Sequence, residues 1–381
     1  MGKQYIFTVN ASQAHTSDIL GVAITNKYTI SVSSDGYAKF WDNKKDEIHN
    51  PSEYVKSCFI NKIGIHHIAA YENTLPSSTV KVTLLAFACF DGSVVFKYYV
   101  NDDFDTLKDW EDTKMSNCWV PQFYRDPESK QDYFIVTKTT GSTSVNHLKI
   151  TEQDGEVAIA IEQTGELDPA TSSFPNSLAV CPTKNKKAAI GYINGDVLLY
   201  DFENLKLVYT FHSPDLQQSY KSSTTSIPRV LAFSPGGTLL AVARDNQAAG
   251  SITLYDVDHG ENVGTLTTPS HNTKSTIGGF AHQGWIMDLS FDEEGKLLAS
   301  GGFDKCVRVW NLETGEREAT INISASDLDD VEQGEHDTSV VSGVRFIKKG
   351  VRGGAGGDSN EGLCVVSFDR GIRWYREAGG I

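Results

Sequence analysis

Residues 34–42 read SDGYAKFWD, and residues 303–311 read FDKCVRVWN. In both stretches an aspartate stands six residues before a tryptophan, and Asp or Asn follows the tryptophan directly. An Ala-His pair lies upstream of each stretch, at residues 14–15 and 281–282. A unit that returns in this form indicates an internal repeat, and a repeat determines how the rest of the chain folds.

Weaker copies of this unit recur along the chain. They are residues 90–96, 140–145, 193–201, 251–256 and 368–375. Short β-branched and aromatic runs surround them, separated by Asp-Gly, Asn-Gly and Pro-Gly turns. Helical periodicity is nearly absent, so the pattern is typical of an all-β protein. Each unit reads as strand, turn, strand, Asp turn, strand and outer strand.

Seven such units, at a spacing of roughly 40–50 residues, have the period of WD40 repeats, which form four strands per blade. We predict a single all-β domain over residues 1–381, a seven-bladed WD40 β-propeller. The expected blades cover residues 14–62, 63–110, 116–165, 172–213, 226–269, 281–323 and 336–377.

The N-terminal residues have no place in the first unit. Residues 5–9 read YIFTV, which is a good strand, whereas the last unit ends without an outer strand. We therefore expect residues 4–10 to complete the last blade and to close the ring, because an unpaired strand edge would otherwise be exposed.

Two sets of side chains resemble a hydrolase triad. They are His15, Ser31, Asp35 and Trp41 in the first unit, and His282, Ser300, Asp304 and Trp310 in the sixth. A nucleophile would need an exposed cleft and an oxyanion donor, which the side chains of one blade do not provide. In WD repeats the same residue types join in a network that holds the Asp turn and satisfies buried polar groups. We therefore predict a structural role for both sets and no enzymatic activity.

The composition excludes several functional classes. The chain has a formal net charge of −15 and no run of basic residues, so we expect no direct contact with nucleic acid. Its six cysteines form no CxxC pair and no spacing fits zinc ligands, so we expect no metal and no cofactor. The cysteines in apolar surroundings suit a reducing compartment. No apolar stretch is long enough to span a membrane, so we expect no membrane association.

One set of positions points to binding. The residue before each Asp turn, and the residue that opens the innermost strand, lie at the rim of the narrower face of a propeller, here called the top face. The candidate contacts at these positions are Phe90, Trp119, Ile193, Trp285, Phe303 and Phe368. The rings either tuck between neighbouring blades or form one contiguous patch. A patch would mark a partner site for an apolar peptide or helix, with basic flanks that suit the acidic chain.

Several segments are similar to one known family. They are residues 15–19, 34–43, 65–67, 233–237, 279–287, 346–350 and 371–380. The tail, which ends in GIRWYREAGG, is the most specific of these matches. On these residues the chain resembles the fungal WD-repeat subunit of the Ski (superkiller) complex. The resemblance spans the whole chain and is weak from about residue 101 to residue 175.

The resemblance implies a non-catalytic scaffold. In that family the propeller binds a tetratricopeptide-repeat subunit and an RNA helicase, and the assembly supports 3′-to-5′ mRNA decay by the cytoplasmic exosome. The family also acts in meiosis, where it binds the topoisomerase-VI-like protein that makes double-strand breaks. The implied location is cytoplasmic, and also nuclear in meiosis. The alternative function is a WD40 adaptor of a ubiquitin ligase or of a chromatin complex.

Overall fold

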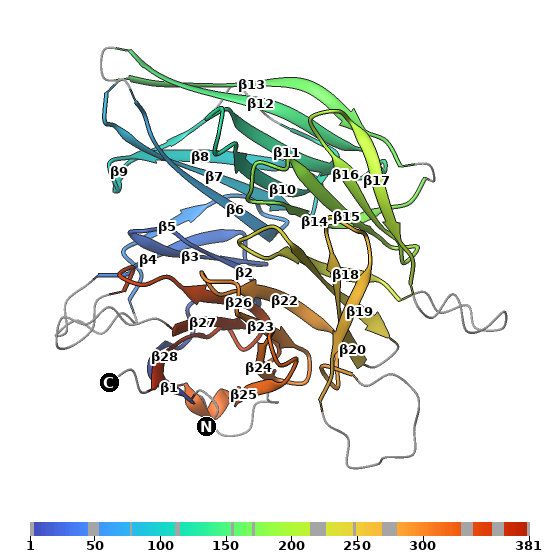
Figure 1. Ribbon diagram of the computed structural model, residues 1–381. Helices are drawn as coiled ribbons and strands as arrows, with labels where there is room; N and C mark the ends of the chain where they lie inside the picture. Colours follow the sequence, from blue (N-terminus) through green and yellow to red (C-terminus); the bar gives the residue numbers. More distant parts are fainter. Residues whose placement is uncertain are drawn as a thin grey trace.

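The computed structural model describes most of the chain. The described residues are 4–44, 53–76, 78–110, 115–153, 156–169, 172–213, 226–246, 249–268, 280–328, 338–352 and 362–378. They form seven four-stranded antiparallel sheets, arranged around one axis as the blades of a propeller (Figure 1). The predicted seven-bladed β-propeller is thereby confirmed.

In the first six blades the strands follow the chain order, from the innermost strand outward (Figure 1). The first blade contains β2 (Ile19–Ile24), β3 (Tyr28–Ser33), β4 (Tyr37–Asp42) and β5 (Lys56–Phe59). The second contains β6 (Ile65–Thr74), β7 (Lys81–Cys89), β8 (Val94–Val100) and β9 (Asp103–Asp109). The third contains β10 (Cys118–Arg125), β11 (Asp132–Lys138), β12 (Thr143–Gln153) and β13 (Glu156–Leu167).

The other four blades repeat this order with one change in the last. The fourth contains β14 (Pro175–Val180), β15 (Lys187–Tyr192), β16 (Val197–Asp201) and β17 (Lys206–Phe211). The fifth contains β18 (Pro228–Phe233), β19 (Leu239–Asn246), β20 (Ala249–Asp256) and β21 (Asn262–Leu266). The sixth contains β22 (Ile286–Phe291), β23 (Leu297–Gly302), β24 (Cys306–Asn311) and β25 (Arg317–Asn322). The seventh contains β26 (Val341–Ile347), β27 (Gly362–Ser367), β28 (Ile372–Ala378) and, as its outer strand, β1 (Gln4–Ala11).

The second strand of a blade is the most deeply buried one. All six residues of β3, β23 and β27 are buried. These strands have a neighbouring blade on each face, so they carry continuous runs of small and β-branched residues instead of an alternating pattern. The core is therefore divided into layers between the blades. One such layer joins Ile30 and Phe40 of the first blade to Phe87 of the second.

Each turn after a second strand that the structure describes in full contains a left-handed residue. Gly36, Gly92 and Gly195 have φ values of 84°, 79° and 97° there, whereas the equivalent residues of the last two blades are Lys305 and Arg370, at 59° and 66°. Gly36 is required for a further reason, because a Cβ atom at this position would lie 2.2 Å from the carbonyl oxygen of Asn61. The first turn thus depends on glycine more strictly than the later ones.

The N-terminal strand closes the ring as predicted. β1 pairs with β28 in an antiparallel register that runs from the Gln4–Ala378 pair to the Ala11–Ile372 pair. The Thr8 hydroxyl donates a hydrogen bond to the Trp374 carbonyl at 2.9 Å. Ala11 is fully buried, in a cluster that also contains Trp41 and Trp374. Both ends of the chain therefore contribute to the junction between the seventh blade and the first.

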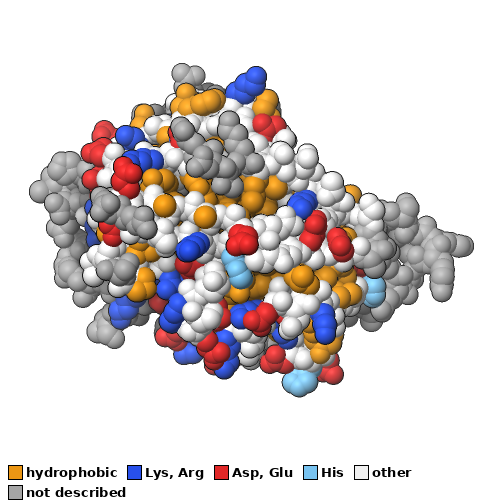
Figure 2. Space-filling model, turned by 90° about the horizontal axis from the view of Figure 1, so that it is seen from above, with side chains coloured by type: hydrophobic (Ala, Val, Ile, Leu, Met, Phe, Trp, Pro, Cys, Tyr) orange, Lys and Arg blue, Asp and Glu red, His pale blue; other side chains and the backbone are white. Residues whose placement is uncertain are grey.

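The outer surface carries charges of both signs. On the face in Figure 2, acidic and basic side chains lie close together, with hydrophobic side chains gathered between them. Among the exposed charges of the described residues, Lys184 pairs with Glu128 at 2.8 Å.

No helix in the described part of the chain is long and apolar enough to cross a membrane.

Candidate functional site

The predicted contact residues lie at the same end of the seven blades. Phe90, Ile193, Phe303 and Phe368 each follow directly after a second strand, namely β7, β15, β23 and β27. Trp119 is the second residue of the innermost strand β10, and Trp285 immediately precedes the innermost strand β22. Because neighbouring strands of a blade are antiparallel, the start of the first strand and the end of the second lie side by side. All six residues therefore lie at the top face.

Most of these side chains are open to solvent. Phe90, Ile193, Trp285 and Phe303 are 45%, 44%, 39% and 38% exposed. Trp119 and Phe368 are half-buried. Large apolar side chains that remain this exposed in neighbouring blades mark a surface that a partner can cover.

Ring contacts join one group of these residues across the second, third and fourth blades. Trp119 stacks on the imidazole of His66 at 3.9 Å between centroids, and it meets Phe90 edge to face at 6.4 Å. Phe174 packs against the other side at 5.2 Å, and its carbonyl accepts a hydrogen bond from the Ile193 amide at 3.0 Å. We call His66, Phe90, Trp119 and Phe174 the Trp119 cluster.

A second group lies across the fifth, sixth and seventh blades. Phe303 meets Trp285 at 5.4 Å and Phe368 at 5.9 Å, both edge to face. The Arg229 guanidinium lies over the Trp285 ring at 4.9 Å from its centroid, and Asp245 holds that guanidinium at 2.8 Å. We call Arg229, Trp285, Phe303 and Phe368 the Trp285 cluster. The six predicted residues thus divide between the surroundings of two clusters.

The structure adds top-face residues that sequence analysis missed. Tyr37 and Phe59 meet edge to face at 5.4 Å and are 40% and 54% exposed, and nearby Ile63 is 48% exposed. The Phe90 amide bonds to the Gly64 carbonyl at 3.2 Å, so this patch borders the Trp119 cluster. Tyr37 directly follows the Asp35-Gly36 turn, so its place in the repeat could have identified it as a top-face residue. Phe59 ends the outer strand β5 and Ile63 follows it, so both lie beyond the recurring Asp-to-Trp stretch, which gave no signal for them.

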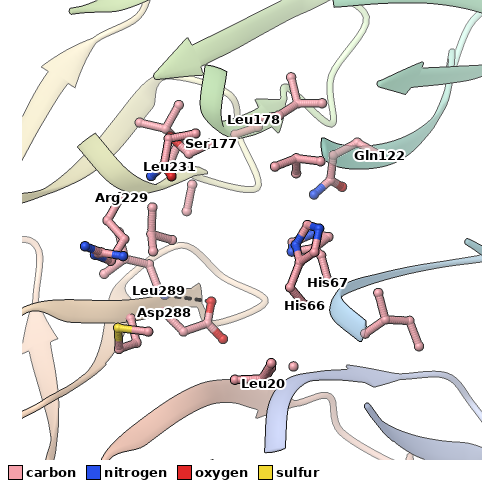
Figure 3. A pocket seen from close by; sticks show the side chains of 18 of the residues that line it. Leu20, His66, His67, Gln122, Ser177, Leu178, Arg229, Leu231, Asp288 and Leu289 are labelled. Atoms are coloured by element: carbon pink, nitrogen blue, oxygen red, sulfur yellow. Dashed lines mark hydrogen bonds between the residues drawn. The ribbon is translucent and has the colours of Figure 1, made fainter. Parts of the chain in front are cut away.

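A cavity of about 530 Å³ lies between the two clusters, along the central axis. His66, Phe90 and Trp119 line it on one side and Arg229 on another. Figure 3 shows His66, His67 and Gln122 on one side of this space, with Arg229 and Asp288 on the opposite side. The aromatic clusters therefore flank the mouth of a polar channel.

The two triad-like sets form the same relay of hydrogen bonds. In the sixth blade, His282 Nδ1 lies 2.8 Å from Asp304 and its Nε2 lies 2.7 Å from Ser300 Oγ. The Trp310 indole N–H donates to the same Ser300 oxygen at 2.9 Å. In the first blade the corresponding distances are 3.0 Å from His15 to Asp35, 2.8 Å from His15 to Ser31, and 3.0 Å from Trp41 to Ser31.

The burial of the two serines indicates that these hydrogen-bonded sets have a structural role. Ser31 and Ser300 are fully buried, and each serine oxygen is occupied by a tryptophan and a histidine. Burial lowers the pKa of His282, which keeps the ring neutral. Burial alone would raise the pKa of Asp304, but the hydrogen bond from His282 and the Arg308 guanidinium outweigh it and hold that pKa at about 2. The arrangement holds a turn in place and offers no substrate access to the serine.

Buried arginines extend these networks, and sequence analysis did not name them. Arg308 lies 2.6 Å from Asp304, and Arg373 lies 2.6 Å from Asp369 in the seventh blade. Arg373 also donates to Ser367 Oγ at 2.8 Å. Each arginine stands four residues after its aspartate, a spacing that could have revealed both. These pairs join the Asp turn to the third strand of the blade.

We expect acid to weaken the fold in two stages. The pKa values of His66 and His67 are lowered by burial to about 4 and about 3, from 6.5, so the unfolded chain binds protons first and stability falls below about pH 6.5. The pKa values of Asp35 and Asp304 are about 2, against 3.8 when unperturbed. Their contribution is complete above about pH 4 and disappears as the pH falls towards 2. Urea unfolding followed by circular dichroism at a series of pH values measures both stages.

The Asp304→Asn variant separates these stages. It should lower the free energy of unfolding at pH 7 by roughly 2–4 kcal/mol, since it removes a charge from a buried hydrogen-bonded network. It should also flatten the pH dependence of the free energy of unfolding between pH 4 and pH 2. Because Asp304 raises the pKa of His282 in the folded protein, its loss should enlarge the decline in stability that begins below about pH 6.5. Wild-type acid dependence in this variant would contradict the assignment.

The described residues contain no group of three or more His, Cys, Asp or Glu side chains that could hold a metal ion.

Comparison with known proteins adds the family. The WD domain, G-beta repeat family matches residues 274–311. The chain is 34% identical to antiviral protein SKI8 of Saccharomyces cerevisiae, over 100% of both chains. It is 26% identical to meiotic recombination protein rec14 of Schizosaccharomyces pombe, over 69% of this chain and 74% of that protein. With a full-length match at this identity on a seven-bladed propeller, the chain belongs to the SKI8 family of WD-repeat proteins.

Proposed function

We propose that this protein is a non-catalytic scaffold subunit of a Ski complex. It binds a tetratricopeptide-repeat protein and an RNA helicase, and thereby supports mRNA decay from the 3′ end by the cytoplasmic exosome. The observation that carries the proposal is the pair of partly exposed aromatic clusters at the top face, on a chain that is similar to SKI8 over its full length. The burial of both network serines argues against a hydrolytic role.

The top face suits an apolar peptide or helix. Burying apolar surface contributes about 25 cal/mol per Å², and aromatic anchors concentrate binding energy in a few positions. Trp119 and Trp285 are held by neighbouring rings, so they lose little rotamer freedom when a partner covers them. The net charge of −15 favours a partner segment with basic flanks. In this proposal the partner proteins bind the RNA, and the propeller holds the partner proteins together.

A second role in meiosis is supported by a separate observation. The similarity to meiotic recombination protein rec14 covers 69% of this chain. In this role the protein binds the topoisomerase-VI-like protein that makes double-strand breaks, and it enters the nucleus in meiotic cells. The same top face serves both roles, because one set of clusters can accept similar apolar segments from different proteins.

Affinity purification of the tagged protein tests the proposal. Mass spectrometry of the co-purifying chains should identify a helicase and a tetratricopeptide-repeat protein in vegetative cells, and the topoisomerase-VI-like protein in meiotic cells. Recovery of cullin adaptors or chromatin proteins, without those chains, would instead support an adaptor of a ubiquitin ligase or of a chromatin complex.

A further inference from the structure

The cavity on the propeller axis has the size of a ligand pocket. All seven innermost strands contribute to its walls, and its volume is about 530 Å³. Pockets for small molecules usually measure about 300–1,000 Å³ and combine an apolar wall with a few converging polar groups. Leu20, Leu178 and Leu289 supply parts of the apolar wall here (Figure 3).

The carboxylate of this wall already has its hydrogen-bond partners. Asp288 is the only carboxylate among the described residues that line the cavity. One of its oxygens accepts the Leu289 amide at 3.0 Å, and the other accepts the Val344 amide at 2.9 Å and a bond from Arg345. A cation in the cavity would therefore have to compete with Arg345 and with two backbone donors.

Donor capacity remains on several sides of the cavity. The side chains of Gln122 and Asn176 line it and bond to no other described residue. Arg229 uses Nε and Nη2 on Asp245, and Arg345 uses Nη1 on Asp288, so each guanidinium keeps further N–H groups. Burial, assisted by the charge of Arg345, lowers the pKa of His67 and keeps its ring neutral. These groups come from the second, third, fourth, fifth and seventh blades.

We propose that the central channel binds a small anion rich in acceptor oxygens, a phosphorylated or polycarboxylate molecule. Arg229 and Arg345 are each paired with one aspartate, and their remaining guanidinium N–H groups match phosphate and carboxylate oxygens geometrically. Gln122 and Asn176 donate from the third and fourth blades. Inorganic phosphate would leave most of the volume empty, so the ligand carries its anionic groups on a larger framework. A ligand in this position cross-links the innermost strands of several blades directly beneath the two aromatic clusters.

The test uses two side chains that form no hydrogen bond with other described residues. Gln122→Glu and Asn176→Asp keep the shape of each side chain and place a negative charge in the channel. Gln163→Glu makes the same change on the exposed outer strand β13 and serves as the matched control. Isothermal titration calorimetry on the full chain at constant ionic strength, with inositol hexakisphosphate and citrate as separate probes, distinguishes phosphorylated from polycarboxylate ligands.

Saturable binding of at least one probe is expected, weakened at least tenfold in Gln122→Glu and in Asn176→Asp and unchanged in Gln163→Glu. Equal thermal unfolding midpoints of the three ligand-free variants show that the fold is intact. If one channel variant folds poorly, the other carries the test. The proposal is overturned if neither probe binds, which would leave the channel to solvent or to a partner side chain. It is also overturned if the channel variants and the control bind alike, since binding would then lie on the outer surface.

Discussion

The Phe303→Glu variant is expected to fold normally and to lose its affinity for the partner that binds the top face. Phe303 lies between Trp285 and Phe368, with ring centroids 5.4 Å and 5.9 Å away, so a carboxylate there stands in the middle of the Trp285 cluster. On partner binding this charge would be buried without a counter-ion. Hot-spot residues of this kind contribute about 2 kcal/mol or more, which corresponds to at least about thirtyfold in Kd.

The fold should tolerate this change. Phe303 is 38% exposed, and the contact that places its backbone, from its amide to the Trp285 carbonyl at 2.9 Å, does not involve the side chain. Val263→Glu is the matched control, because Val263 is 53% exposed on the outer strand β21. Binding of the purified tetratricopeptide-repeat subunit is measured by calorimetry. A folded Phe303→Glu protein that binds as tightly as Val263→Glu would remove the Trp285 cluster from the interface.

Deletion of residues 4–11 is expected to destabilise the entire ring. It removes β1, leaves β28 as an unpaired edge, and exposes the junction cluster around Trp41 and Trp374. Domains are stable by only about 5–15 kcal/mol, and the loss of a whole paired strand is of comparable size. The blades depend on their neighbours on both sides, so the damage should extend beyond the seventh blade.

Thermal unfolding followed by circular dichroism measures this effect. A peptide of residues 4–11, added in trans, should raise the midpoint of the deletion variant in proportion to the logarithm of its concentration, because it binds only the folded chain. Ala11→Asp is a second variant, since it places a charge at a fully buried position of the same junction. A deletion variant that unfolds at the wild-type temperature would show that β1 does not close the ring.

The fold could be predicted because the residues that mark each repeat lie close together in the sequence. Asp35 and Trp41, like Asp304 and Trp310, stand at a constant spacing, since both belong to one turn and the strand that follows it. The hydrogen bonds from each tryptophan to a buried serine explain why that spacing recurs. The closing role of the N-terminal strand could also be predicted. The first unit had no place for the strand at residues 5–9, and the last unit lacked an outer strand.

The arrangement of the top face could be predicted from the sequence only in part. The register of the repeat placed Phe90 and Phe303 at one end of the ring, but it did not indicate which rings meet. Phe59 and Ile63 lie beyond the recurring Asp-to-Trp stretch, and Arg229 joins Trp285 from a different blade. Such contacts depend on the rotation and the distance between neighbouring blades. The spacing of residues along the chain does not determine either quantity.

The sequence by itself therefore determined the number of blades, the direction of each strand, and the end of the ring at which the Asp turns lie. The division of the aromatic residues into two clusters, and the polar channel between them, arise only when the ring closes. Gln122, Asn176 and Arg345 come from three separate blades and look like ordinary surface residues in the sequence. Closure brings their strands around one axis, and a site whose residues come from five different blades exists only in that arrangement.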